Sequence, residues 1–362
     1  MPLLDLKVRN VRNLKEVDIN PSSQINILYG PNASGKTSLL ESIYLLARGK
    51  SFRTQHITSI INNESTTLSI SSKIAQADGQ RASLGIEHRD GQFRMKAEGT
   101  LLKRASDLAN YLPLVVIHQD CHQMFSLGPK CRRRFLDWGV FHVEHGFLPA
   151  WRRYTRALKQ RNAALQQETS SSLSFREAWD EDLCEMAEYI HILRERYLQR
   201  FTGVFNAYVD RLFDDGVTIT LGYQAGWKTS EDLRSILFQS YPKDKAMCRT
   251  QYGPHRADLQ ARIKGKPAQE VLSRGQQKLL SYAMYLAQAD LYRSITGNPC
   301  IILADDIGAE LDPSRFETLT TLLESLGVQV FLTTTDPHRK AGWRKLEQRM
   351  FHVEHGKIKE VI

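Results

Sequence analysis

The chain has 362 residues, 41% of them hydrophobic, and carries a formal net charge of +9 at pH 7. This length can bury a large core and predicts two or three structural units, while the basic charge suits either an acidic partner such as nucleic acid or simply a solvated basic surface. The five cysteines are scattered, odd in number and without a Cys-x-x-Cys pair, which argues against a disulfide framework or a zinc module and indicates a reducing compartment.

The first part of the chain, from Leu3 to about Ile117, contains short apolar runs between turn residues, which predict β-strands. The opening letters MPLLDLKVRN place charges where a secretory signal needs an unbroken apolar core. No window of the sequence approaches the ~18 apolar residues of a membrane-spanning helix. We therefore expect a soluble cytoplasmic protein without a membrane segment.

The motif GPNASGKT, from Gly30 to Thr37, has the spacing of a phosphate-binding loop: Gly, four residues, then Gly-Lys-Thr. Its backbone must curl so that N–H groups point at a phosphate, and glycine permits this where a Cβ would collide. The lysine then reaches the terminal phosphates and the threonine hydroxyl can bind Mg²⁺. The run INILY before it predicts a strand and SLLESIYLLA after it a helix, which disfavours a chance match. The expected nucleotide-binding residues here are Gly30, Asn32, Ser34, Gly35, Lys36, Thr37 and Ser38.

The middle of the chain, from about Arg132 to Leu212, is expected to be helical because apolar residues recur at three and four and glycine is nearly absent. ETSSSLS, at Glu168 to Ser174, is expected as an internal linker. Strand and helix patterns return afterwards. The sequence thus predicts an α/β domain interrupted by a helical insert, with residues 1–118 and 245–362 in the first lobe and 119–244 in the insert.

The insert begins with a basic stretch, in which nine basic residues stand against two acids between residues 130 and 161. Arg152, Arg156 and Lys159 recur at four and three, on one face of a helix. A basic stripe without aromatic stacking positions suits contact with a duplex backbone better than single-strand or base-specific recognition. Residues 132 and 133 could instead pair with acids in the domain core. The expected DNA contacts are Lys130, Arg132, Arg133, Arg152, Arg153, Arg156 and Lys159.

The stretch LSRGQQKLL, from Leu272 to Leu280, opens a strongly periodic helix although its arginine and glycine offer no core contact. Ser273 is a good N-cap, and Gly275 leaves the first N–H groups of the helix bare, which makes the helix start a second anion site. Since the phosphate loop already holds the phosphates of one nucleotide, this second site is expected to cap a nucleotide held by another copy of the chain. The expected contacts in trans are Ser273, Gly275 and Gln276; an ordinary capped helix is the alternative.

A phosphate loop needs a carboxylate from a neighbouring strand to hold magnesium, and the buried-strand pattern CIILADDI contains Asp305 and Asp306 near its end. We expect Asp305 to hold Mg²⁺ together with Thr37. Asp306 is expected to act on the attacking water as general base or orienter, a catalytic role. Two acids that merely cap the end of a strand are the alternative.

The motif FHVEHG occurs twice, at Phe141 to Gly146 and at Phe351 to Gly356, and gives two His-x-x-His pairs. On a strand those histidines point to opposite faces, and no third ligand stands at metal spacing, so we expect no zinc site. The second copy instead predicts a terminal hairpin, MFHVEHGKIKEVI, that turns at Gly356.

Together these motifs resemble the ABC-type ATPases, whose signature is Leu-Ser-Gly-Gly-Gln; LSRGQ matches it at four of five positions. The resemblance implies an ABC-type P-loop ATPase lobe with an inserted, mostly helical second lobe, which binds ATP and Mg²⁺ and closes head to tail with a second copy. It implies a catalytic Gln119 that senses Mg²⁺ and the attacking water, and a loop along the dimer seam at Ala309 to Asp312. The usual switch histidine is missing from TTTDPH, so Thr334, Thr335 or Asp336 would take its role.

Longer blocks are similar to the RecF family of bacterial recombination mediators and cover the chain from end to end. They are VRNVRNL near the start, GKSFRT at Gly49 to Thr54, QDCHQMFSLGPKCRRRFLDW at Gln119 to Trp138, LKQRNAAL at Leu158 to Leu165 and YGPHRADL at Tyr252 to Leu259. The resemblance implies an ATP-dependent DNA-binding dimer with slow hydrolysis that works with RecR and RecO to bring RecA to single-stranded gaps beside duplex. His255 and Arg256 are expected to have a structural or nucleotide-sensing role. The competing interpretation is an ABC-type subunit that energises a transporter or another partner, with the basic stripe incidental.

Overall fold

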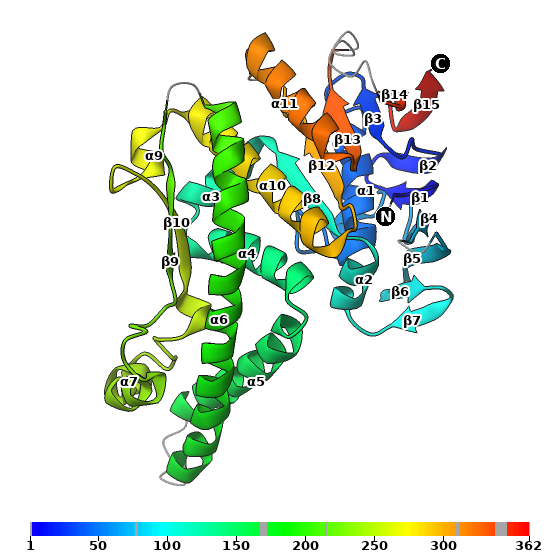
Figure 1. Ribbon diagram of the computed structural model, residues 1–362. Coiled ribbons are helices and arrows are strands. Elements are labelled where there is room, and N and C mark those ends of the chain that lie inside the picture. Colours follow the sequence, from blue (N-terminus) through cyan, green and yellow to red (C-terminus); the bar gives the residue numbers. More distant parts are fainter. Residues whose placement is uncertain are drawn as a thin grey trace. The chain divides into compact units, whose positions relative to one another are not determined.

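The computed structural model describes residues 2–76, 79–166, 172–213, 216–308, 311–336 and 346–361, with the backbone alone for residue 119 and for residues 172–178. The chain forms two compact units (Figure 1). The first unit comprises Met1–Cys121 and Lys278–Ile362, and the second comprises His122–Gln277.

The first unit contains a mostly parallel sheet in the order β15-β14-β3-β13-β12-β8. Strands from β14 to β8 run parallel to their neighbours, whereas β15 pairs antiparallel with β14. The central strands are almost wholly buried, which explains their continuous apolar runs. The strands are β3 Ile25–Tyr29, β8 Leu114–His118, β12 Ile301–Asp305, β13 Gln329–Thr334, β14 Gln348–Glu354 and β15 Lys357–Val361.

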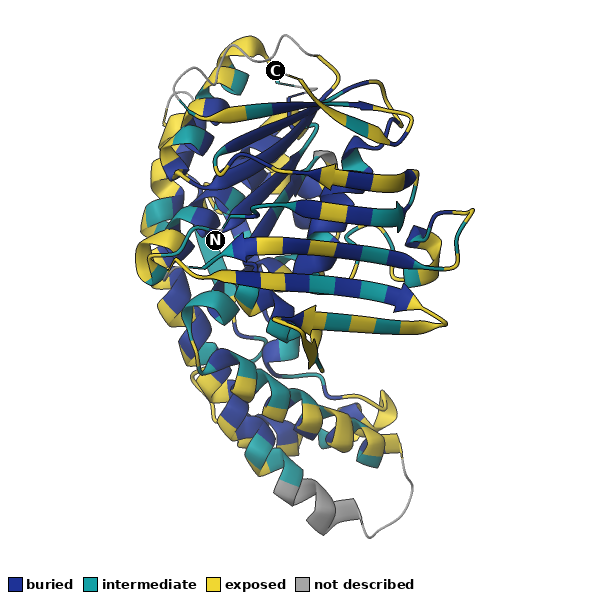
Figure 2. Cartoon of the chain, turned by 90° about the vertical axis from the view of Figure 1, so that its right-hand side faces the viewer, coloured by how far each residue is buried: buried dark blue, intermediate teal, exposed yellow. Residues whose placement is uncertain are grey.

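A second, antiparallel sheet of this unit has the order β2-β1-β4-β5-β6-β7. Buried and exposed residues alternate along its strands (Figure 2), because one face packs on the core and the other meets solvent. The strands are β1 Leu6–Val11, β2 Leu14–Ile19, β4 Leu68–Ala75, β5 Arg81–Arg89, β6 Gln92–Ala97 and β7 Thr100–Leu102.

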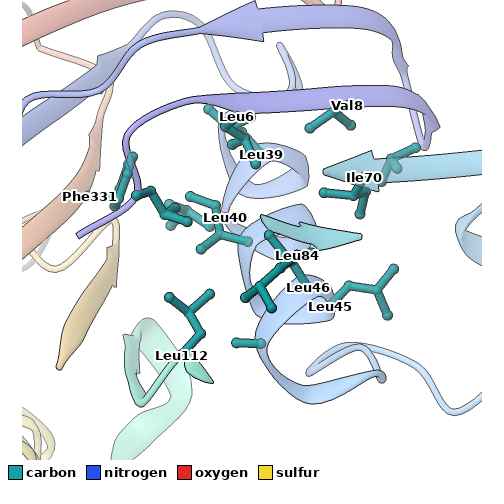
Figure 3. Close-up of a cluster of buried hydrophobic side chains, with 14 of the residues drawn as sticks. Leu6, Val8, Leu39, Leu40, Leu45, Leu46, Ile70, Leu84, Leu112 and Phe331 are labelled. Carbon is teal, nitrogen blue, oxygen red and sulfur yellow. The ribbon is translucent and has the colours of Figure 1, made fainter. Parts of the chain in front are cut away.

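Helix α1, Lys36–Arg48, contacts strands of both sheets of the first unit. Its buried leucines, among them Leu39 and Leu45, lie among Val8, Ile70 and Leu84 of the antiparallel sheet (Figure 3). Each leucine buried in this way stabilises the fold by roughly 1.5–3 kcal/mol, so α1 has a fixed place between the two sheets. The other helices of this part are α2 Ala105–Tyr111, α11 Pro313–Leu326 and the 3-10 helix Ile57–Ile60, and α10 Arg274–Thr296 runs into it from the second unit.

The second unit consists of packed helices and a small antiparallel sheet in the order β11-β10-β9. Its long helices α5 and α6 pack against each other. The helices are α3 Gln123–Ser126, α4 Pro129–Val143, α5 Phe147–Gln166, α6 Ser172–Leu212, α7 Leu233–Gln239, α8 Tyr241–Ala246, the 3-10 helix Pro254–Arg256 and α9 Ala268–Val271. The strands are β9 Thr220–Gln224, β10 Asp258–Ile263 and β11 Lys266–Pro267.

The second unit is longer than the expected insert, which was placed at residues 119–244. Its end lies at Gln277 because β10 pairs antiparallel with β9, with Leu259 opposite Tyr223. A strand after residue 245 therefore completes a sheet with a strand before it. Periodicity within a segment carries no information about such a pairing.

The predicted α/β architecture with a helical insert is confirmed, and so is the terminal hairpin, in which β14 and β15 are joined at His355 and Gly356. Contrary to the assumption of opposite faces, the first FHVEHG copy does not lie on a strand, because residues 141–143 end helix α4, in agreement with the helical pattern predicted from about Arg132. Apolar spacing keeps this segment helical, with Leu136 and Val140 buried on one face. Of the expected linker, residues 168–171 lie outside the described part and residues 172–174 begin α6.

Candidate functional site

The phosphate-binding loop lies between β3 and α1, as its spacing predicts. Gly30 and Gly35 have φ angles of +155° and +122°, a region that favours glycine. A Cβ on Gly30 would lie 2.1 Å from the carbonyl oxygen of Val353, so only glycine fits there. The buried hydroxyl of Ser34 has no hydrogen-bond partner among the described residues, which leaves it available to a phosphate oxygen. Asn32 is exposed on the loop.

The side chain of Lys36 is folded along this loop. Its Nζ donates to the carbonyl oxygens of Gly30 and Pro31, both at 2.7 Å. Burial lowers the pKa of Lys36, and the nearby charges of Asp306 and Asp305 oppose this effect. The ammonium group, the loop and the two acids therefore act on one another within a single site.

The carboxylate of Asp305 meets two hydroxyl groups at the end of β12. Thr37 Oγ1 donates to Asp305 Oδ1 at 3.1 Å, and Thr333 Oγ1 donates to the same oxygen at 2.8 Å. Burial raises the pKa of Asp305, and the two hydroxyl donors act in the opposite direction. A carboxylate and a hydroxyl are the hard oxygen ligands that Mg²⁺ prefers, and a bound cation would offset the cost of burying the charge. These residues therefore fit the metal that the sequence predicts.

Asp306 adopts an unusual backbone conformation, with φ at +51°. Such left-handed conformations are uncommon for residues other than glycine and cluster at functional sites. The Asp306 N–H donates to Thr333 Oγ1 at 2.8 Å, so one threonine contacts both acidic residues. Thr333 lies near the end of β13 and begins the TTTDPH segment, but its contacts with these acids could not be predicted, because only the parallel pairing of β12 and β13 brings it here.

Ser38, which is expected to contact the nucleotide, donates through its Oγ to Asn13 Oδ1 at 2.9 Å. Asn13 belongs to the block VRNVRNL and stands in the turn between β1 and β2. It is a site residue that sequence reasoning missed, since its partners lie 20 or more residues away.

Two of the sequence blocks meet at a buried acid of helix α1, Glu41, whose side chain is fully buried. Arg12 from VRNVRNL donates through Nε and Nη2 to its two carboxylate oxygens, both at 3.0 Å. From GKSFRT, the Ser51 hydroxyl donates to the same carboxylate and Arg53 lies 3.7 Å from it. A buried carboxylate needs such partners, so Glu41 ties both blocks to the helix that follows the phosphate loop.

The predicted N-cap at the start of α10 is confirmed. Gln276 N–H donates to Ser273 Oγ at 3.3 Å, and Ser273 N–H donates to Gln276 Oε1 at 3.0 Å, which forms a capping box. Gly275 is exposed and has no positive φ, and no described atom lies within 4 Å of a Cβ built on it. Nothing within the described chain therefore requires glycine at this position.

The remaining predicted nucleotide elements are described only in part. Gln119 begins the 3-10 helix Gln119–His122 directly after β8, and its side chain lies outside the described atoms. Of the expected seam loop, residues 309 and 310 are also outside the description, whereas Asp312 caps α11 by accepting from the Arg315 N–H. In the TTTDPH segment, the Asp336 N–H donates to Thr334 Oγ1 at 3.1 Å.

The predicted DNA-contacting residues divide into two groups. Arg132 is engaged in the core of the second unit, where Nε and Nη2 donate to Asp258 at 2.7 and 3.0 Å and the side chain is only 12% exposed. Arg133 Nη1 donates to the carbonyl oxygen of Ala257 at 2.6 Å, and burial lowers its pKa. Pairing with an acid of the core, the alternative to DNA contact, therefore describes Arg132, whereas Arg133 contacts a backbone carbonyl instead.

The other basic residues lie nearer the surface. Lys130, Arg156 and Lys159 are exposed and Arg152 is half-buried. Arg153 is 53% exposed and pairs with Asp182 and Glu185 of α6. Arg161, further along α5, is fully buried.

His255 is held by its neighbours within the second unit. Tyr154 Oη lies 2.5 Å from His255 Nδ1, and His255 Nε2 lies 3.1 Å from the carbonyl oxygen of Thr250. Burial lowers the pKa of His255 to about 4, so the ring is neutral at pH 7. Of the two roles expected for this residue, structural or nucleotide-sensing, these contacts are compatible with the structural one.

Among the described residues, no group of three or more His, Cys, Asp or Glu side chains could hold a metal ion. Within the same ranges, no helix is both long and apolar enough to cross a bilayer.

The family model, the related sequences and the solved structures that match this chain all include RecF proteins. The family described as RecF/RecN/SMC N terminal domain matches residues 2–359. The DNA replication and repair protein RecF of Pseudomonas paraeruginosa is 42% identical over 365 residues, covering 99% of this chain and 98% of that protein. A solved structure of the recombination mediator protein RecF-ATP in the RecFOR pathway has a TM-score of 0.88 at 24% identity and covers 100% of this chain and 98% of its own. A crystal structure of the Smc head bound to the C-winged helix domain of ScpA has a TM-score of 0.62 at 16% identity, with coverages of 100% and 97%. At these identities the two structures bear on the fold alone, and they support the predicted ATPase-type lobe with its insert.

Proposed function

Because the chain belongs to the RecF family, within the RecF/RecN/SMC N-terminal domain proteins, and is a DNA replication and repair protein, we propose that it is an ATP-dependent DNA-binding protein of recombinational repair. ATP closes a head-to-tail dimer on DNA and hydrolysis releases it, so that a weak, DNA-stimulated ATPase acts as a timer. With partners of the RecR and RecO type, the dimer assists RecA loading at single-stranded gaps next to duplex.

The observation that carries this proposal is the convergence of Lys36, Thr37 and Asp305 beside the phosphate-binding loop. Thr37 Oγ1 and Asp305 Oδ1 lie 3.1 Å apart, a pairing suited to one magnesium ion held between them. When bound, Mg²⁺ would neutralise charge on the terminal phosphates of ATP. The open hydroxyl of Ser34 and the amides of the loop would bind phosphate oxygens.

Gly275 supports the part of the proposal that concerns the dimer. Gly275 lies in the first turn of α10, where a Cβ would meet no described atom within 4 Å. No contact within the described chain therefore calls for glycine at this position. A close approach by a γ-phosphate held on another copy explains the choice, because a bare helix start binds anions through its N–H groups. Ser273 and Gln276 would join it, with their side chains released from the capping box.

We expect Gly275→Val and Ser273→Ala to weaken ATP-driven dimerisation by about tenfold or more, the loss of one to two good contacts. The binding of ATP to the single chain should change little, because neither residue belongs to the phosphate loop. Sedimentation of the full chain with and without a non-hydrolysable ATP analogue measures the first quantity, and titration with a fluorescent analogue the second. Lys36→Arg serves as the reference that loses ATP-driven dimerisation through its own loop. Dimerisation of the Gly275 variant at wild-type strength would contradict contact in trans.

DNA binding is proposed through the exposed cations of the insert, Lys130, Arg156 and Lys159, with Arg152 beside them. Arg132 and Arg133 are excluded from this role here because they bind Asp258 and a backbone carbonyl within the core. A long cationic side chain at the surface binds phosphate without base specificity and releases counterions as it does so. Such contact suits a protein that must grip duplex of any sequence.

We therefore expect the triple variant Lys130→Gln, Arg156→Gln and Lys159→Gln to lower the salt dependence of duplex binding. Each phosphate contact removed should reduce the slope of log affinity against log salt by about one unit. Fluorescence anisotropy of a labelled duplex across a salt series measures this slope, and Arg153→Gln is a matched control because its guanidinium already pairs with two acids. If the triple variant keeps the wild-type slope, the insert does not grip DNA at these residues. If the wild type binds no duplex at all, the competing function of energising another partner takes precedence.

A further inference from the structure

We infer that Asn13 and Gly356 are positioning residues that shape the phosphate-binding loop from its outer side, an inference that rests on the proposed nucleotide binding of that loop. Asn13 stands in the turn between β1 and β2, and Gly356 in the turn between β14 and β15. The loop itself joins β3 to α1. Three turns that are far apart in sequence therefore meet at one place.

The first observation is the way in which the side chain of Asn13 brackets the loop. Its Nδ2 donates to the carbonyl oxygens of Ser34 at 3.0 Å and Ala33 at 3.3 Å. Its Oδ1 accepts from Ser38 Oγ, in the first turn of α1, at 2.9 Å. One amide group thus joins the loop to the start of the helix that follows it.

These bonds matter because of how a phosphate loop works. N–H groups that point inward at a phosphate leave the carbonyl groups of the same peptides pointing outward. Such carbonyl oxygens need donors when they lie against the protein rather than water. The Asn13 amide supplies donors to two consecutive carbonyls, and so holds the adjoining N–H groups in the orientation that an anion requires.

Gly356 provides a second donor to the same place. Its N–H donates to the carbonyl oxygen of Ser34 at 2.8 Å. Its φ is +75°, and a Cβ would lie 2.0 Å from the carbonyl oxygen of Asn13, so the turn requires glycine both for conformation and for space. On the same hairpin, the Val353 carbonyl lies against Gly30. The terminal hairpin therefore supports the loop at both of its ends.

The experiment replaces each residue in the full chain, as Asn13→Ala and Gly356→Ala, and measures affinity for a fluorescent ATP analogue together with ATP turnover at saturating ATP. We expect each variant to bind about tenfold more weakly while turnover at saturation stays close to wild type, because neither residue reaches the reacting atoms. Asn13→Asp should lose at least as much as Asn13→Ala, since a carboxylate keeps the acceptor and lacks both donors. In the nucleotide-free protein, both alanine variants should also speed hydrogen exchange of the amides of residues 33–38.

Two matched controls separate positioning from general damage. Asn62→Ala removes a side-chain amide that donates at 2.6 Å to the carbonyl oxygen of Arg12, the neighbour of Asn13 in the β1–β2 turn. The side chain of Asn62 has no described hydrogen bond to the phosphate-binding loop. Gly91→Ala strains a hairpin turn of similar φ, +73°, where no described atom lies within 4 Å of a Cβ. Both controls should keep nucleotide affinity within about twofold of wild type.

The inference is overturned if Asn13→Ala keeps wild-type affinity, if Asn13→Asp restores it, or if the two controls lose as much as their test variants. Should Gly356→Ala fail to fold, Asn13→Ala still decides the question. If the wild-type protein binds no ATP, the proposed function is wrong. The hydrogen-exchange rates of the amides of residues 33–38 would then test the positioning role by themselves. Equal exchange in Asn13→Ala and Asn62→Ala would count against it.

Discussion

Replacing Arg161 by methionine is expected to lower the free energy of unfolding by about 3–5 kcal/mol, the usual cost of removing one partner from a buried ion pair. The Arg161 side chain is fully buried and donates at 2.7 Å to both Asp180 and Asp244. Methionine keeps most of the apolar volume but leaves the Asp244 carboxylate, itself fully buried, without its cation. The uncompensated charge, rather than a cavity, then dominates the loss. Urea denaturation of the variant, followed by circular dichroism, measures the change.

The control lies on the same helix, two turns earlier. Arg153→Met also removes an arginine that pairs with two acids, Asp182 and Glu185. Because this guanidinium is 53% exposed, water and salt screen the pair, and the variant should lose far less stability than Arg161→Met. Similar losses in the two variants would mean that burial does not set the strength of these pairs.

This contrast shows where sequence patterns stop being informative. Charge alone places Arg161 and Arg132 in one basic stretch with Lys130 and Lys159. The acids that take the first two out of that stretch lie 83 and 126 residues further along the chain, at Asp244 and Asp258. Helical spacing already sets Arg161 on the buried face of α5 with Tyr154 and Ala157. No local period encodes the distant acids, so only the fold shows which partners these two arginines have.

The residues of the nucleotide site likewise include some that the sequence predicts and some that only the fold brings there. The phosphate loop, the strand that ends in Asp305 and the terminal hairpin could be predicted, because each depends on the spacing of neighbouring residues. Asn13, Glu41 and Thr333 could not, because tertiary pairing alone brings them to the site. Asn13 lies in the block VRNVRNL, Glu41 in the helix after the phosphate loop and Thr333 in the TTTDPH segment, but none of these patterns indicates which distant side chain each residue meets.

Asp306→Asn is expected to reduce ATP turnover by about 100-fold or more, the usual contribution of a group that moves or orients a proton. Asn is the informative replacement because it also tolerates the left-handed φ of +51° that this position requires. The backbone, its bond to Thr333 Oγ1 and the neighbouring Asp305 should therefore stay in place. What is lost is the carboxylate that would orient or deprotonate the attacking water.

ATP binding should remain close to wild type in Asp306→Asn, since the phosphate loop and the Thr37 and Asp305 pair are untouched. The variant should then accumulate as an ATP-bound dimer that leaves DNA slowly, because in the proposed cycle hydrolysis is what opens it. Phosphate-release kinetics measure the turnover, and the rate at which labelled duplex dissociates measures the release. Asp18→Asn, which removes an exposed carboxylate 3.5 Å from Lys7, is the control for a simple loss of charge. Wild-type turnover in Asp306→Asn would show that the water is oriented by another group and would shift the catalytic role to Gln119 or the TTTD segment.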